Sequence, residues 1–447
     1  MTQGYSEIRR KLLHIGMVAF APLLRVLTWQ QAALCAIGAF LFNAVLLPRL
    51  GGSALNRPTD RARGYPLGIL LYPVAVLALI LVFRSRLDIA AAAWGILAVG
   101  DGSATLAGLS GHRHPLSWNR SKSIEGLMAF VVAGGGAAVA LAWWTAPSIL
   151  ARPDPAFLLA APLLAALAAG LAETVPIKLD DNITVPAVSA AVMWLLTFVS
   201  EDAWIAARPL VTANLPMALL VNSVAAIGGW RLGTVRMSGM LVGWAIGVAV
   251  YAGAGPAGWT LLFITFLSAA VTSKLGLKRK RLLGIDEERG GRRGGGNAFA
   301  NTGLAAVAAL AAVATPYREA SLLALVAALV TGGSDTIASE IGKAWGGKTY
   351  LVTTLSHVKP GTPGAMSVEG TIAGVVGAIG LASLGAVFGL IPASLIWVAV
   401  AGSVAGSLLE SVLAATLEAS GMVNNDVLNF LNTSAGAIVA ITLMRMV

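Results

Sequence analysis

Long apolar runs separated by short polar loops dominate the pattern of this chain. Each run is about 17 to 25 residues long, the length of a helix that crosses the hydrocarbon core of a bilayer. We predict about 15 such spans, at residues 12–27, 30–47, 67–83, 88–109, 124–145, 156–174, 184–200, 209–229, 237–253, 257–273, 297–314, 320–342, 367–389, 392–417 and 428–446. The pattern predicts an all-α fold, a polytopic transmembrane helical bundle.

Composition supports the same class. Of the 447 residues, 57% are hydrophobic and only 12% are charged, so no water-soluble fold could cover the apolar surface. The first run follows three basic residues but has no small-residue cleavage site, and we expect the N-terminus to be retained. Cys35 is the single cysteine, which excludes disulfides and a cysteine metal site.

The net charge of +10 is distributed between the spans. If the N-terminus is cytoplasmic, most Lys and Arg residues fall on the inside, as the positive-inside rule requires. The loops with polar motifs then share the cytoplasmic face of what we expect to be a bacterial inner membrane; these loops are 110–123, 175–183, 274–296, 343–366 and 418–427. Scattered basic residues favour anionic substrates and do not indicate nucleic acid.

Two segments of the chain repeat one order of motifs. Asp101–Gly108 and Asp335–Gly342 both read Asp-x-x-Ala-[Ser/Thr]-x-x-Gly, a stripe along one helix face. Each octet leads into a basic loop that ends in Ser-x-Glu-Gly, at Ser123–Gly126 and Ser367–Gly370. The repeat predicts two motif-related halves, residues 1–200 and 210–447, joined by the less apolar stretch from Ser200 to Pro209.

Carboxylates lie close to the cytoplasmic ends of spans in both halves. They are Asp101, Glu125, Glu173, Asp180 and Asp181 in the first half and Asp335, Glu369, Glu410 and Asp426 in the second. Oxygen ligands without His or Cys suit Mg²⁺ that bridges a nucleoside triphosphate, and argue against zinc. Helix capping, buried acid pairs or the cation path of a transporter would also place carboxylates there.

Basic residues near these carboxylates are candidates for contacts with phosphate. They are Arg10, Lys11, His14 and Lys122 in the first half and Arg292, Arg293, Lys343 and Lys359 in the second. Glycine-rich turns with lysine or arginine can cradle phosphate oxygens, although neither loop has the P-loop pattern. The competing interpretation is that these basic residues belong to solvated loops and to a cytoplasmic anchor before the first helix, and that they only follow the positive-inside rule. His112 and His114 have no further metal-type partners, so we interpret them as surface residues.

The motifs of the first half resemble the phytol and dolichol kinase family of integral membrane enzymes. The matching segments are Arg10-Lys11-x-x-His14, Gly100-Asp101-Gly102-x-Ala104, Lys122-Ser123-x-Glu125-Gly126, Glu173 and Asp180-Asp181-Asn182. The second half is similar to the family that contains the plant phytyl-phosphate kinases. Its matching segments are Gly290 to Arg293, Ala300-Asn301, Ser334 to Gly342, Gly361 to Gly370 and Asn425-Asp426-x-x-Asn429.

The resemblance implies a bifunctional enzyme of the lipid bilayer. A prenol such as phytol, geranylgeraniol or farnesol would be phosphorylated by the first half, and the prenyl monophosphate would become the diphosphate in the second. CTP is the implied donor and Mg²⁺ the implied cofactor. The implied magnesium ligands are foremost Asp101, Glu125 and Asp181 in the first half and Asp335, Glu369 and Asp426 in the second.

The same resemblance implies further site residues. Lys122 and Glu340 would act in catalysis, and the residues that would bind the nucleotide, besides the basic groups above, are Ser123, Asn182, Asn425 and Asn429. The sequence departs from the family pattern at Asn297, where Gln is expected, and at Glu410-Ser411, where Asp precedes Ser. Two alternatives stay open: a cytidylyltransferase that forms a CDP-lipid, and a two-repeat transporter of prenyl phosphates or cations. The sequence indicates no oligomeric state.

Overall fold

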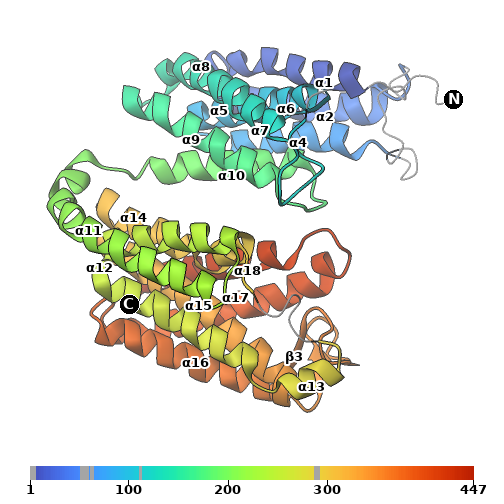
Figure 1. Cartoon of the computed structure of the whole chain (residues 1–447). Coiled ribbons are helices and arrows are strands. Elements are labelled where there is room, and N and C mark those ends of the chain that lie inside the picture. The colour runs from blue at the N-terminus through green and yellow to red at the C-terminus, as the bar shows by residue number, and fades with distance from the viewer. Residues whose placement is uncertain (1–6, 51–59, 61–64, 110–112, 286–291, 447) are drawn as a thin grey trace. The chain divides into compact units, whose positions relative to one another are not determined.

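The computed structural model describes residues 7–50, 60, 65–109, 113–285 and 292–446, and the chain divides into two compact units, Met1–Phe198 and Val199–Val447 (Figure 1). Among these described residues, 11 helices are long and apolar enough to cross a membrane, and two shorter apolar helices accompany them. The predicted all-α polytopic fold is confirmed. The chain is an integral membrane protein, and the expected number of about 15 spans is an approximation.

Unit 1 is a bundle of helices joined by short 3₁₀ and π-helical segments. Its α-helices are α1 (Glu7–Gly16), α2 (Trp29–Leu41), α4 (Leu67–Val82), α5 (Leu87–Gly95), α6 (Asp101–Leu109), α7 (Ile124–Ala129), α8 (Gly135–Thr145), α9 (Pro155–Glu173) and α10 (Asp181–Leu196). The intervening segments are η1 (Met17–Arg25), η2 (Phe42–Leu46), η4 (Ile96–Gly100), η5 (Phe130–Gly134) and η6 (Ala146–Ser148).

The octet of each unit lies on that unit's most buried span. In unit 1 this span is Leu87–Leu109, formed by α5, η4 and α6, with 72% of its most apolar stretch buried. In unit 2 it is Arg318–Trp345, with 78% buried. The alanines from Ala90 to Ala93 are at most 1% exposed, and such small side chains let neighbouring helices approach closely. The octets are therefore held at the centre of each bundle.

Unit 2 has longer helices and a small sheet. Its helices are α11 (Glu201–Arg231), α12 (Met237–Lys274), α13 (Leu277–Leu282), α14 (Gly295–Ala314), α15 (Arg318–Trp345), α16 (Val368–Val387), η8 (Ala393–Leu395), α17 (Ile396–Leu413), η9 (Ala414–Glu418) and α18 (Asn425–Met444). The antiparallel sheet follows α15 in the order β2-β1-β3, with strands β1 (Thr349–Leu351), β2 (His357–Val358) and β3 (Ala365–Ser367).

Helix α12 turns back on itself at Gly255. This residue has φ 69° and ψ −169°, a conformation that side chains beyond glycine rarely adopt. The Arg293 guanidinium lies 5.6 Å from the Phe266 ring, and a Cβ on Gly239 would lie 2.4 Å from the Arg293 carbonyl oxygen. In one straight helix, positions 239 and 266 would be about 40 Å apart. The two arms therefore run side by side, as the two separate spans predicted for this region require.

The Ser-x-Glu-Gly segments have the same structural role in both units. Ser123 and Ser367 cap α7 and α16, since each hydroxyl accepts a hydrogen bond of 3.1 Å from the N–H of Gly126 or Gly370. A Cβ at Gly126 would lie 3.2 Å from the carbonyl oxygen of the octet's alanine, and at Gly370 the corresponding distance is 2.6 Å. Glycine thus lets the capped helix touch the octet helix, which is a shared device of the two halves.

Candidate functional site

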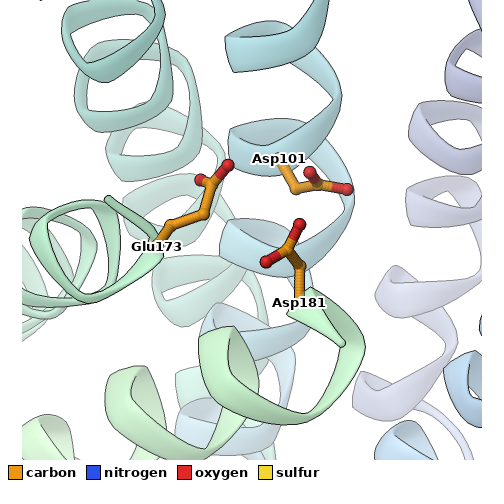
Figure 2. Close-up of side chains that lie close together, drawn as sticks. All are labelled: Asp101, Glu173 and Asp181. Carbon is orange, nitrogen blue, oxygen red and sulfur yellow. The ribbon is translucent and has the colours of Figure 1, made fainter. Parts of the chain in front are cut away.

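Three carboxylates meet at one end of unit 1. Asp101 begins α6, Glu173 ends α9 and Asp181 begins α10. Each offers an oxygen atom, and these atoms lie within 4.8 Å of one another. Figure 2 shows the three side chains pointing toward one another from three different helices. Asp101 is 3% exposed and Glu173 9% exposed, so these charges need compensation inside the protein.

Two lysines supply part of that compensation. The Lys11 Nζ lies 2.5 Å from Asp101 Oδ2, and the Lys122 Nζ lies 2.6 Å from Glu173 Oε1. Burial lowers the pKa of the Lys122 ammonium, but Glu173 and Asp181 outweigh burial and hold that pKa above its ordinary value. Three carboxylates thus face two ammonium groups, so the site would still attract a further positive charge.

His14 lies beside this cluster on α1. Its Nε2 is 3.0 Å from the Leu97 carbonyl oxygen and 3.4 Å from Asp101 Oδ2. Its ring contacts the Tyr72 ring at a centroid distance of 4.7 Å. The predicted Arg-Lys-x-x-His motif is therefore brought to Asp101, with Lys11 as the direct partner.

The Asp180-Asp181-Asn182 segment is fixed by its own hydrogen bonds. The Asp180 carboxylate caps α10, since Oδ1 accepts from Asn182 N at 3.0 Å and from Asn182 Nδ2 at 2.6 Å. A Cβ on Gly68 would lie 3.5 Å from both side chains and 4.0 Å from Arg10. Asn182 and Arg10 therefore both lie next to the start of α4. Asp180 fixes the first turn of α10, where Asp181 lies.

The loop before α7 forms one wall of a cavity that is lined partly by polar and charged side chains. Its Trp118 Nε1 donates to Thr174 Oγ1 at 3.0 Å, and its Asn119 Nδ2 donates to the Thr174 carbonyl oxygen at 3.0 Å. These contacts hold the loop against the end of α9, where a cavity of about 200 Å³ is lined by Lys122, Glu173 and other residues of the loop, α6 and α9. No sequence pattern indicated these three anchoring residues, because their pairing joins segments about 55 positions apart.

Glu125 lies apart from the three carboxylates. Its carboxylate accepts hydrogen bonds from the backbone N–H of His114 and lies 2.5 Å from His114 Nδ1. Glu369 has the corresponding position in unit 2, where it accepts from Gly347 N at 3.1 Å. Neither belongs to the three-carboxylate group. Both residues were expected to hold magnesium; each lies in the first turn of its helix, α7 or α16, and its carboxylate accepts a hydrogen bond from the loop before that helix. His112 lies outside the described residues.

The acidic residues of unit 2 form two smaller groups. The Asp335 and Glu410 carboxylates lie close to each other, and Asn432 Nδ2 donates to Glu410. Two neighbouring carboxylates repel each other, so this pair attracts positive charge. Asp426 pairs with Asn297 at the start of α18. Among the described residues of unit 2 the carboxylates do not converge as they do in unit 1.

Glu340 is held by two lysines. The Lys280 Nζ lies 2.5 Å from Glu340 Oε2, and the Lys343 Nζ lies 2.9 Å from Glu340 Oε1. Lys280 is 1% exposed and also donates to the carbonyl oxygens of Thr272 and Ser273 at the end of α12. The predicted catalytic residue thus lies in an ion-pair cluster that joins α12, α13 and α15.

The other predicted nucleotide contacts of unit 2 surround this end of the bundle. A Cβ on Gly233 would lie 3.2 Å from the Arg292 guanidinium. Lys359 is exposed after β2, Asn425 is exposed at the start of α18, and Asn429 is buried one turn later. Gly290 of the predicted arginine loop lies outside the described residues, as do the acidic positions 286–288.

Comparison with known proteins places this arrangement in a family. The model of the integral membrane protein family DUF92 matches residues 220–437. An uncharacterized membrane protein of Synechocystis is 40% identical over 201 residues, which are 44% of this chain and 78% of that protein. The chain belongs to the DUF92 family. No solved structure matches it.

Other relatives of this DUF92 protein are plant proteins. The chloroplast protein VTE6 of Arabidopsis thaliana is 35% identical over 217 residues, 47% of this chain and 65% of the relative. A probable phytol kinase 3 of Glycine max chloroplasts is 28% identical over 201 residues, 42% of this chain and 62% of the relative. The resemblance predicted from the motifs is confirmed by these relatives.

Proposed function

We propose that this DUF92 protein is a membrane-embedded bifunctional kinase. Unit 1 would transfer a phosphoryl group from CTP to a prenol, and unit 2 would convert the prenyl monophosphate to the diphosphate. The observation that carries the proposal is the convergence of Asp101, Glu173 and Asp181 beside Lys11 and Lys122, at an end of helices that form a lipid-facing bundle.

The donor set of unit 1 fits magnesium. Asp101, Glu173 and Asp181 offer only oxygen atoms, which Mg²⁺ prefers, and they are close enough to share one ion. When bound, Mg²⁺ would offset negative charge on the nucleotide phosphates. Without a cation these carboxylates would repel a triphosphate, and we therefore assign Asp101, Glu173 and Asp181 as the ligands in unit 1, with Glu125 as an anchor of its loop.

The basic groups have a separate task in this proposal. Lys122 keeps its charge and lines the cavity next to Glu173, so its ammonium can contact a phosphate oxygen while Glu173 holds it in place. Phosphoryl transfer depends mostly on positioning and on neutralising charge. The cavity is lined by serine, threonine and arginine side chains as well, a lining that suits phosphates better than a lipid tail.

The proposal for unit 2 rests on its repeated motifs. Asp335 occupies the octet position of Asp101, and its partner Glu410 follows it on α17, in the same motif order as Glu173 on α9. The name of the Glycine max relative, a probable phytol kinase, supports a kinase-type transferase, with an isoprenoid alcohol as the substrate proposed for unit 1. We propose that Asp335 and Glu410 form the acidic centre of the second step, and that Asp426, in a separate group with Asn297, contributes a further carboxylate.

Isotope placement tests this function. Purified protein in detergent is incubated with magnesium, a panel of prenols and CTP labelled at either the α or the γ phosphate, and the lipid products are weighed by mass spectrometry. Label from the γ position in the lipid supports a kinase. Label from the α position would show a cytidylyltransferase, and binding without any phosphorylated product would favour a transporter.

The two-step assignment has its own test. We expect Asp335→Asn to let prenyl monophosphate accumulate, because only the second unit loses its central carboxylate. Asp101→Asn should stop prenol phosphorylation while added monophosphate is still converted. The prenyl monophosphate and the prenyl diphosphate are both followed by mass spectrometry. Equal loss of both steps in both variants would exclude two separate sites.

A further inference from the structure

Unit 2 contains an apolar groove that the acidic residues do not explain. It has a volume of about 160 Å³ and lies between α11, the two arms of α12, α14 and α15. Glycines at 239, 243 and 247 line one side, and Trp244, Trp259 and Phe263 line the other parts. Of these three glycines, Gly243 borders open space, since a Cβ there would meet no atom within 4 Å, whereas Gly239 and Gly247 let Arg293 and Asn222 approach α12 closely.

One end of the groove is polar and basic. Arg293, Asn297, Asn301 and Thr336 line it, and Asn297 is hydrogen-bonded to Asp426. The Arg293 guanidinium lies over the Phe266 ring, at the same level as Gly239 on the other arm. No carboxylate is among the described residues that line the groove. This end therefore suits an anion next to the acidic centre of unit 2.

The opposite end is closed by a hydrogen-bonded pair. Trp259 Nε1 donates to Asn222 Oδ1 at 2.9 Å, and Asn222 is 4% exposed. A Cβ on Gly247 would lie only 1.8 Å from Asn222 Oδ1, so glycine is required for this closure. The eight helical steps from Gly239 to Gly247 span about 12 Å of helix, which sets the length of the groove.

The side of the groove is open to the surface that faces hydrocarbon in a bilayer. Trp244 is 36% exposed and Phe263 42% exposed. Only 11% of the most apolar stretch of α11 is buried. An apolar chain could therefore enter from the bilayer, between α11 and α12, while its polar head stays at the Arg293 end.

We propose that this groove binds the isoprenoid tail of a prenyl monophosphate, with the phosphate at Arg293 and the tail running toward Trp259. The inference rests on the proposed function of unit 2 and names the place of its lipid substrate. The phosphate head is selected by charge, because the Arg293 guanidinium and the amide side chains of Asn297 and Asn301 face it beside Asp426. The Asn222–Trp259 pair closes the groove after about 12 Å, so the groove holds the isoprene units next to the phosphate, and the rest of a longer tail leaves through the open side.

Filling the groove tests this assignment. A Cβ on Gly243 would meet no atom within 4 Å, and the same holds for Gly380 on α16 outside the groove. Gly243→Leu therefore adds bulk to the groove from a Cβ that fits without a clash, and Gly380→Leu, whose Cβ also fits, is its matched control. Binding of labelled geranylgeranyl monophosphate is measured in detergent without nucleotide. We expect Gly243→Leu to raise Kd about tenfold, equivalent to about 1.4 kcal/mol, Gly243→Ala to raise it less, and Gly380→Leu to change it less than about twofold.

Two results would overturn the assignment. Equal affinity of wild-type and Gly243→Leu protein would show that the tail does not lie in the groove. Equal competition by a phospholipid would show a general lipid groove without a preference for prenyl phosphates. Transfer from γ-labelled CTP is measured in parallel: intact groove binding without transfer would refute the kinase proposal while supporting the groove.

Discussion

Asp101→Asn separates a structural from a chemical role of the buried acid. The Lys11 and Asp101 side chains are each 5% exposed and lie 2.5 Å apart. At that distance, with an effective dielectric constant of about 20, their attraction is about 7 kcal/mol. Desolvation offsets part of it, and removal of one partner of a buried pair costs about 3–5 kcal/mol, because the other charge stays buried alone.

The loss should be measurable as a thermal shift. For a unit of this size, 1 kcal/mol changes the melting temperature by about 2–4 °C, so 3 kcal/mol corresponds to about 6–12 °C. A thermal scan of the purified protein in detergent, with Asp101→Asn beside wild type, gives this shift. We also expect prenol phosphorylation to fall at least about 100-fold, because a charge-stabilising group of the site is removed.

A double variant separates the two effects. Lys11→Met combined with Asp101→Asn removes both charges, so stability should return to within about 1 kcal/mol of wild type. Activity should stay low, because the carboxylate is still missing. Lys11→Met alone is the control, since it leaves Asp101 buried without its partner. Recovery of prenol phosphorylation in the double variant would refute our reasoning, because Asp101 would then act only as the counter-ion of Lys11.

Two further predictions concern the other lysines. Lys280→Met should lower the free energy of unfolding by about 3 kcal/mol, because Glu340 stays buried without this partner. The Lys343 side chain is 31% exposed, so Lys343→Met should cost at most about 1 kcal/mol. Equal thermal shifts of the two variants would contradict this prediction. The stability difference between wild type and Lys122→Met should be the same at pH 8 and pH 9.5. The raised pKa of Lys122 keeps its ammonium charged beside Glu173 at both pH values, and the stabilisation is lost only as pH rises through that pKa. A difference that declines between these two pH values would show that the carboxylates do not raise the Lys122 pKa.

The spans could be predicted because bilayer thickness fixes helix length. Apolar runs of the required length are read directly from the sequence, and even the two arms of α12 were predicted separately, since Gly255 and Pro256 interrupt the run. The octet repeat led us to predict two motif-related halves, and the structure gives Ser123 and Ser367 identical capping roles.

What the sequence determined by itself is therefore the class of protein, the spans and the residue types that concentrate near their ends. Only the tertiary structure decided which of those residues meet. Glu173 joins Asp101 from 72 positions away, whereas Glu125, much nearer in sequence, turns to the loop at His114. Hydropathy and spacing describe one helix at a time, but the meeting of side chains depends on how helix ends pack, and that packing is set by small residues on several helices together.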